Sequence, residues 1–149
     1  PDIPNDIDIY VALESFEHIP EHNVPFILQC IAGKNPYLLA CSVPIEVGPS
    51  IWIKNFGSKI MGYYRHKEYT WKETFLAGLF LLDKLPPHGL GHKGFDWRWL
   101  KHTIRQSMEI KSISTSPFTF LPALVSTSIC FAAKPRREQK EETKIHAFH

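Results

Sequence analysis

The chain has 149 residues, of which 44% are apolar and 21% are charged, and its formal net charge is +2. These values are typical of one globular domain with a core of its own, and they argue against a disordered chain. The three cysteines are an odd number, which excludes a scaffold held together only by paired disulfides. We therefore expect an intracellular, reducing compartment.

The N-terminal part of the chain predicts strands. Residues 6–14 alternate between apolar and polar side chains, which indicates a half-buried strand. Residues 26–43 carry two apolar runs on either side of Lys34 and Asn35, a pattern that predicts a β-hairpin, and residues 50–54 predict a further strand. On such a hairpin Cys30 and Cys41 share a face as diagonal neighbours, about 7–8 Å apart and beyond disulfide reach.

The middle of the chain predicts helices. Thr70 and Glu73 have the spacing of a capping box, so we expect a helix from about residue 70 to the two prolines at 86 and 87. Asp96 is a good N-cap for a second helix, whose apolar stripe includes Trp97. Residues 55–66 predict a shorter helix, with apolar side chains at 56, 60 and 64 in register.

Residues 112–133 form a window of 22 residues without one charged side chain. As a single helix it would be about 33 Å long, enough for a membrane span. Two prolines and eight hydroxyl residues argue against that interpretation, and residues 124–131 alternate with a period of two. We therefore expect strands here, with a membrane span as the alternative.

Together these patterns predict an α+β fold. A largely antiparallel sheet, made of N-terminal strands and a C-terminal strand pair, is expected to pack against two or three central helices. We expect residues 1–133 to form a single domain and residues 134–149 to form a charged tail.

Charge is distributed unevenly along the sequence. Residues 1–23 hold six acids and no Lys or Arg, whereas residues 54–111 hold eleven Lys or Arg against five acids. In the second segment basic and aromatic residues alternate, which favours an electropositive contact surface. The residues expected to contact a partner there are Arg65, Lys67, Lys72, Arg98, Trp99 and Lys101.

No set of side chains in this sequence indicates a catalytic, metal or cofactor site. The function we expect is therefore a non-enzymatic binding or accessory domain. Its partner would be anionic, either a nucleic acid, an acidic protein or a lipid headgroup, and it would dock on the basic, aromatic central region.

Two alternatives remain open at this point. Residues 89–94 match a glycine-rich pattern that leads into the helix at Asp96. Backbone N–H groups there would suit a phosphorylated small molecule, bound by an enzyme or a ligand-binding domain. The candidate ligand-binding residues are Gly89, Gly91, His92, Lys93 and Gly94. The other alternative is a single-pass accessory subunit of a membrane complex.

Overall fold

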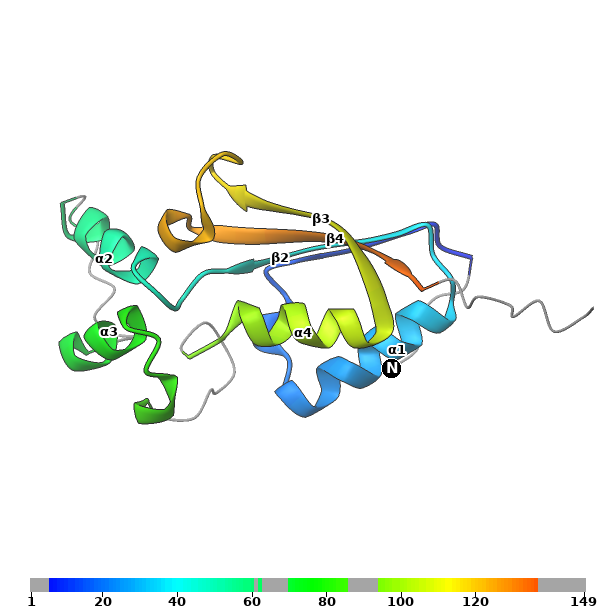
Figure 1. The fold of residues 1–149 in the computed structure, drawn as a ribbon, viewed down its shortest axis with the longest axis horizontal. Helices are drawn as coiled ribbons and strands as arrows, with labels where there is room; N and C mark the ends of the chain where they lie inside the picture. The colour runs from blue at the N-terminus through cyan, green and yellow to red at the C-terminus, as the bar shows by residue number, and fades with distance from the viewer. Residues whose placement is uncertain (1–5, 61, 63–69, 86–93, 137–149) are drawn as a thin grey trace, which may run out of the picture.

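The computed structural model describes residues 6–60, 62, 70–85 and 94–136. This part of the chain has an α+β fold with four α-helices and a four-stranded sheet (Figure 1). The strands are β1 (Ile9–Leu13), β2 (Leu38–Pro44), β3 (Met108–Ser116) and β4 (Ser128–Pro135). The helices are α1 (Val24–Gly33), α2 (Ser50–Ile60), α3 (Trp71–Gly78) and α4 (Trp97–Ser107).

The sheet has the strand order β1-β2-β4-β3 and is mostly antiparallel. Both pairs that involve β4 are antiparallel, and β1 pairs with β2 in parallel. A parallel pair needs a long crossover connection, which α1 supplies between the two strands. The predicted α+β class and the mostly antiparallel sheet are thus confirmed.

The predicted hairpin over residues 26–43 is wrong, because its first half is the helix α1. Pro25 lies in the first turn of α1, where a proline has no N–H to lose. Val24, Leu28 and Ile31 are buried at steps of four and three residues, which is the spacing of one helical face. Cys30 consequently lies on a helix, and it does not share a strand face with Cys41.

The predicted strand over residues 50–54 is also wrong, because these residues begin α2. Gly48 has a φ of 85°, and the N–H of Ile51 donates to the Gly48 carbonyl at 3.1 Å. The turn at Gly48 and Pro49 thus starts a helix, and the apolar stripe expected at residues 56 and 60 extends back to Trp52. The shorter helix expected at 55–66 is the second half of α2 as far as residue 60.

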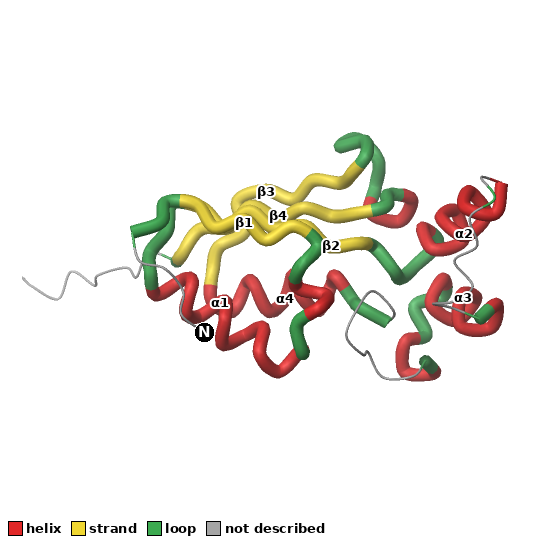
Figure 2. Tube along the Cα trace, turned by 180° about the vertical axis from the view of Figure 1, so that it is seen from behind, coloured by secondary structure: helices red, strands yellow, loops and turns green. Residues whose placement is uncertain are grey.

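The helices α1 and α4 lie on one side of the sheet, as Figure 2 shows. The main core lies between these two helices and the sheet, with Phe16, Leu28, Leu100, Ile104 and Phe131 almost fully buried. The helices α2 and α3 lie beyond one end of the sheet (Figure 1). They have a small core of their own around Ile51, Ala77 and Leu85.

The uncharged window contains strands at both ends, since β3 runs to Ser116 and β4 starts at Ser128, whereas residues 117–127 between them are not strand. Residue 112 pairs with residue 132, and Ile113 pairs with Phe131, in antiparallel register. The strand β4 continues past the window to Pro135. The expected strand around residue 119 is a turn, which precedes the short 3₁₀ helix η5 (Ala123–Val125).

The alternative of one helix across this window is therefore wrong. Among the described residues, the longest helices have 11 residues, and none is both apolar and long enough to cross a bilayer. A crossing requires about 20 residues in helical form.

Candidate functional site

The helices α2 and α3 are held together by an aromatic ring against a glycine. The indole of Trp52 lies against Gly78, and its Nε1 donates a hydrogen bond to the carbonyl of Thr74 at 3.2 Å. The side-chain amide of Asn55 donates to the hydroxyl of Thr74 at 3.0 Å. These contacts hold α2 against α3, so that side chains of both helices line one surface.

A second contact fixes this helix pair to the rest of the molecule. The ring of Phe80 lies directly over Gly48, where a Cβ would be 2.4 Å from the end of the ring. The Gly48 N–H donates to the carbonyl of Ala77 at 2.8 Å. The guanidinium of Arg98 lies over the ring of Phe80, 4.6 Å from its centroid. Phe80 thereby links α3 to the start of α2 and to α4.

A groove of about 450 Å³ lies on the surface that α2 and α3 share. Four aromatic side chains supply most of its lining, and all four are exposed. Phe56, Trp71 and Phe75 each have more than half of their surface in contact with solvent. The residues that line the groove are Trp52, Asn55, Phe56, Lys59, Trp71, Thr74 and Phe75.

Exposed apolar side chains continue along the same helices beyond this groove. Ile53 and Ile60 on α2 and Leu79 at the end of α3 are 52%, 71% and 45% exposed. Contiguous exposed apolar surface is uncommon on a soluble protein and marks interaction sites. The lining and these flanking residues together are called the α2–α3 surface below.

Among the described residues, the charged side chain in the lining of the groove is a lysine. Lys59 is in the lining, and its Nζ is 6.0 Å from the centroid of the Trp71 ring. Lys72 is exposed on α3, next to Trp71. The nearest acid along α3, Glu73, accepts hydrogen bonds from the backbone and hydroxyl of Thr70, in the capping box that the sequence predicts.

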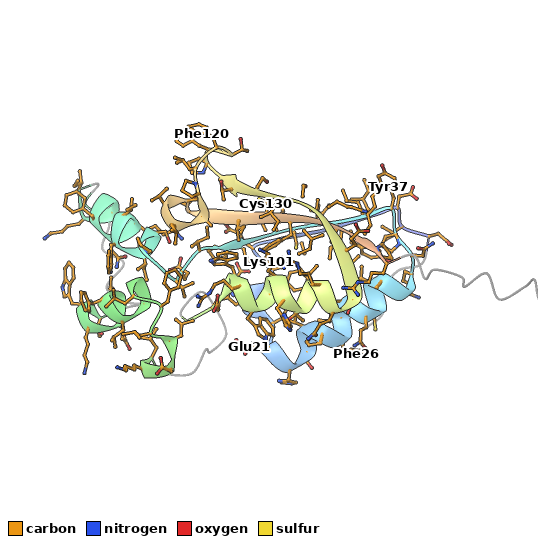
Figure 3. All side chains as sticks on the ribbon, viewed as in Figure 1. Glu21, Phe26, Tyr37, Lys101, Phe120 and Cys130 are labelled. Atoms are coloured by element: carbon orange, nitrogen blue, oxygen red, sulfur yellow. The ribbon has the colours of Figure 1, made fainter. Side chains whose placement is uncertain are left out.

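The partner-binding residues expected from the sequence are distributed over separate parts of the molecule. Lys72 is exposed on α3, next to Trp71 in the sequence, whereas Lys101 lies on α4 (Figure 3). Arg98 forms two-pronged hydrogen bonds with Asp96, at 2.9 and 2.8 Å, and these bonds raise the pKa of Arg98. Arg65 and Lys67 lie outside the described residues.

Trp99, which the sequence predicts as a contact residue, is half-buried against the main core. Its ring meets the buried ring of Phe95 edge-on, with centroids 6.4 Å apart. The helix α4 packs against both the sheet and α1, and its buried arc is therefore wide enough to include Trp99 beside Leu100.

The glycine-rich segment lies outside the described residues, except for Gly94, which has a φ of 77°. The predicted positions that cannot be placed are Gly89, Gly91, His92 and Lys93. At the start of α4 the carboxylate of Asp96 accepts a hydrogen bond from the N–H of Arg98 at 2.9 Å. A carboxylate already occupies this helix end, which disfavours a phosphate there.

In the part of the chain that the structure describes, no three His, Cys, Asp or Glu side chains gather as a metal-binding group. Glu17 and Glu46 are fully buried acids. Lys54 is close to Glu46, with 3.1 Å between its Nζ and the carboxylate, and also donates to the carbonyl of Ile45 at 2.7 Å. This ion pair fixes α2 to the end of β2.

Trp52 falls in residues 50–54, which the sequence predicts as a strand, whereas Asn55 and Lys59 fall in the predicted helix but were not expected to form a site. The steps of four residues between Trp52, Phe56 and Ile60 were the signal that placed them on one helix. The chain matches no protein-family model, and a search of curated proteins finds no match either.

Proposed function

We propose that this chain is a non-enzymatic binding domain, and that it docks an acidic amphipathic helix of a partner protein on the α2–α3 surface. The observation that carries the proposal is the groove with four exposed aromatic side chains and a lysine at its rim. Insertion of one apolar helical face into such a groove is a common mode of peptide recognition.

The exposure of the lining favours a large occupant. A small ligand is usually buried by 70–90% in an enclosing pocket. Here Phe56, Trp71 and Phe75 are each more than half exposed, and Ile53, Ile60 and Leu79 extend the apolar surface past the groove. A segment of about four helical turns, roughly 20 Å long, would cover both parts.

The charges favour an acidic partner, and the apolar lining favours a protein over a nucleic acid. Lys59 lines the groove beside the aromatic side chains, Lys72 is exposed next to Trp71 in the sequence, and the described residues of the lining include no acid. Nucleic-acid affinity rests on many phosphate contacts, usually six or more for a strongly salt-dependent protein. Two lysines around apolar side chains fit a helix with a few Glu or Asp beside its apolar stripe better.

Fluorescence anisotropy with a labelled synthetic peptide tests this proposal. The probe is an amphipathic helix of about 14 residues with a Leu/Phe stripe flanked by Glu. A peptide of the same composition with the stripe scrambled, a labelled oligothymidine and vesicles with anionic lipid complete the panel. We expect the amphipathic peptide to bind most tightly, with affinity falling as salt rises from about 50 to 500 mM.

Two substitutions and a matched control locate the binding surface. Phe56→Ala and Trp71→Ala should each weaken binding at least about tenfold, because buried aromatic anchors carry most interface energy. Phe26→Ala serves as the control, since Phe26 is 55% exposed on α1, far from the α2–α3 surface (Figure 3). Equal binding of the scrambled peptide, or tighter binding of oligothymidine or vesicles, would contradict the proposal.

A further inference from the structure

The two edges of the sheet differ in how they are protected. The edge strand β3 has a bulge between Ile110 and Ser112, and it carries the exposed ion pair of Glu109 and Lys111. Bulges and charges of this kind block pairing with another strand. The other edge strand, β1, reads Ile-Tyr-Val-Ala-Leu, without charge, proline or bulge. Within the described part of the chain, no strand pairs with the outer edge of β1.

The backbone of β1 offers regularly spaced groups at this edge. Leu38 donates its N–H to the carbonyl of Asp8 at 3.1 Å, and the N–H of Glu14 donates to the carbonyl of Ser42 at 2.9 Å. The N–H and C=O groups of the even-numbered residues of β1 therefore point toward β2. In a strand the backbone groups of successive residues point to opposite sides, so those of the odd-numbered residues point away from β2. Ile9, Val11 and Leu13 consequently direct their N–H groups outward.

The outward carbonyls are those of the same three residues. The hydroxyl of Ser15 donates to the carbonyl of Leu13 at 2.9 Å and so ends the free edge. Among the described residues, the outward N–H groups of Ile9, Val11 and Leu13 and the carbonyls of Ile9 and Val11 have no hydrogen-bond partner. Five main-chain groups are thus available to a neighbouring strand.

The side chains of Ile9, Val11 and Leu13 lie on the face of β1 opposite those of Tyr10 and Ala12, because side chains alternate along a strand. Ile9, Val11 and Leu13 are 49%, 62% and 64% exposed, whereas Tyr10 and Ala12 pack against the main core. Cys130 lies on the same open face of the sheet, because it alternates with buried Ile129 and Phe131. An added strand would bring apolar side chains alongside those of β1.

Acidic side chains lie at both ends of β1. Asp6, Asp8 and Glu14 are all exposed. In an antiparallel pair of two copies centred on Val11, Asp8 would face Glu14 of the other copy, and like charges directly opposite are destabilising. A shift by two residues places Asp6 opposite Glu14 in one direction and Tyr10 opposite Glu14 in the other, and both shifts keep the acids of the two copies along one shared edge. The charges therefore disfavour a second copy of this chain and favour a strand with basic ends.

We infer that β1 accepts an extended segment of a partner protein as a fifth strand, one with alternating apolar side chains and Lys or Arg at its ends. Its backbone would bond to the five outward groups of Ile9, Val11 and Leu13, in the strand-addition mode of peptide recognition. This surface is separate from the α2–α3 surface and takes a partner segment of opposite charge.

Amide hydrogen exchange followed by NMR, on the full chain with a synthetic peptide, tests the inference. The peptide has alternating Val and Thr over about six residues, a typical strand length, with two lysines at each end. We expect exchange at the amides of Ile9, Val11 and Leu13 to slow at least about tenfold, with Tyr10 and Ala12 little changed. The same peptide with Glu in place of Lys should give no protection.

Variants separate the contribution of side chains from that of charge. Val11→Lys should weaken peptide binding at least about tenfold. Leu124→Lys, at an exposed position of η5, should bind like the unchanged protein. Asp8→Asn with Glu14→Gln leaves the apolar residues intact and should both weaken binding and remove its salt dependence.

Three results would overturn the inference. The first is equal protection by the Lys and Glu peptides. The second is protection from exchange at the amides of Ile9, Val11 and Leu13 that grows with protein concentration in the absence of peptide. That result would mean that a second copy of the chain pairs with β1. The third is protection of these amides in the isolated chain at every concentration, which would assign it to another segment of this chain.

Discussion

The indole of Trp52 occupies the space that a side chain at position 78 would need. A Cβ on Gly78 would lie 2.1 Å from Nε1 of Trp52 and 2.2 Å from the neighbouring ring carbon. Only glycine permits this approach, and the approach holds α2 against α3 with their exposed aromatic side chains on one surface. The geometry of the proposed docking site therefore depends on this pair.

Gly78→Ala should destabilise the protein, although alanine is by about 1 kcal/mol the better helix former. The overlap with the rigid indole should cost more than that gain, about 1–3 kcal/mol, and should shift the NMR signal of the Trp52 indole N–H. Gly57→Ala on α2 is the matched control, because nothing lies within 4 Å of a Cβ there. The control should keep or raise the thermal midpoint, and a Gly78→Ala protein as stable as Gly57→Ala would refute the packing described.

Local signals in the sequence predicted some elements correctly, and long-range pairing explains the errors. The capping box of Thr70 and Glu73 and the cap at Asp96 act within one helical turn, so they could be recognised without the rest of the chain. In contrast, residues 26–33 contain residues common in both helices and strands. Their helical state is set by packing of Leu28 and Ile31 against the sheet, which the sequence does not show directly.

The candidate site was predicted only in part, for the same reason. The sequence shows directly that residues 54–111, which include Lys72, are rich in basic and aromatic side chains. The groove, however, depends on the contact between Trp52 and Gly78, which are 26 positions apart, and on the turn at Gly48. Whether Trp99 is exposed was likewise decided by the packing of α4 on two neighbours.

Replacement of Lys54 by leucine should destabilise the protein by about 3–5 kcal/mol, because it removes the ammonium group that lies 3.1 Å from the buried Glu46 carboxylate. Urea unfolding measures this loss. Lys111→Leu is the matched control, since the Glu109–Lys111 pair is exposed and such pairs contribute about 0–1 kcal/mol. Similar losses for the two variants would show that the Glu46–Lys54 pair is not buried. The double variant Glu46→Leu/Lys54→Leu should recover part of the loss.

Burial raises the pKa of the Cys41 thiol from its ordinary value of 9.0 to about 12, with a smaller contribution from Cys130. At neutral pH we expect iodoacetamide to label the half-buried Cys30 and Cys130 before Cys41, as peptide mass mapping would show. Labelling of Cys41 at the rate of the other two would contradict its buried position.

The same pKa predicts how stability changes in alkaline solution. Because the folded pKa lies above the unfolded one, the contribution of the protonated thiol to stability is complete below pH 9.0 and is lost as pH rises toward 12. The free energy of unfolding in urea should therefore fall more between about pH 8 and pH 10.5 in the unchanged protein than in Cys41→Ala. Equal falls in the two proteins would count against the shifted pKa.

Removal of the capping box should weaken α3. Thr70→Ala eliminates the hydroxyl that accepts the N–H of Glu73 at 3.3 Å, and it should lower stability by about 1 kcal/mol. Thr70→Ser retains the hydroxyl and should stay close to the unchanged protein in thermal unfolding. If serine and alanine lowered the midpoint equally, the cap would not contribute through its hydrogen bonds.

A charge exchange between protein and peptide tests the central claim most directly. Lys59→Glu with Lys72→Glu reverses the charge of the lysine in the lining and of the exposed lysine next to Trp71, and it leaves the aromatic lining unchanged. Anisotropy titrations should show that this variant loses affinity for the Glu-flanked amphipathic peptide and gains affinity for the same peptide flanked by Lys. The account predicts at least about a tenfold change in each direction. Unchanged affinities for both peptides would contradict docking of an acidic helix on the α2–α3 surface.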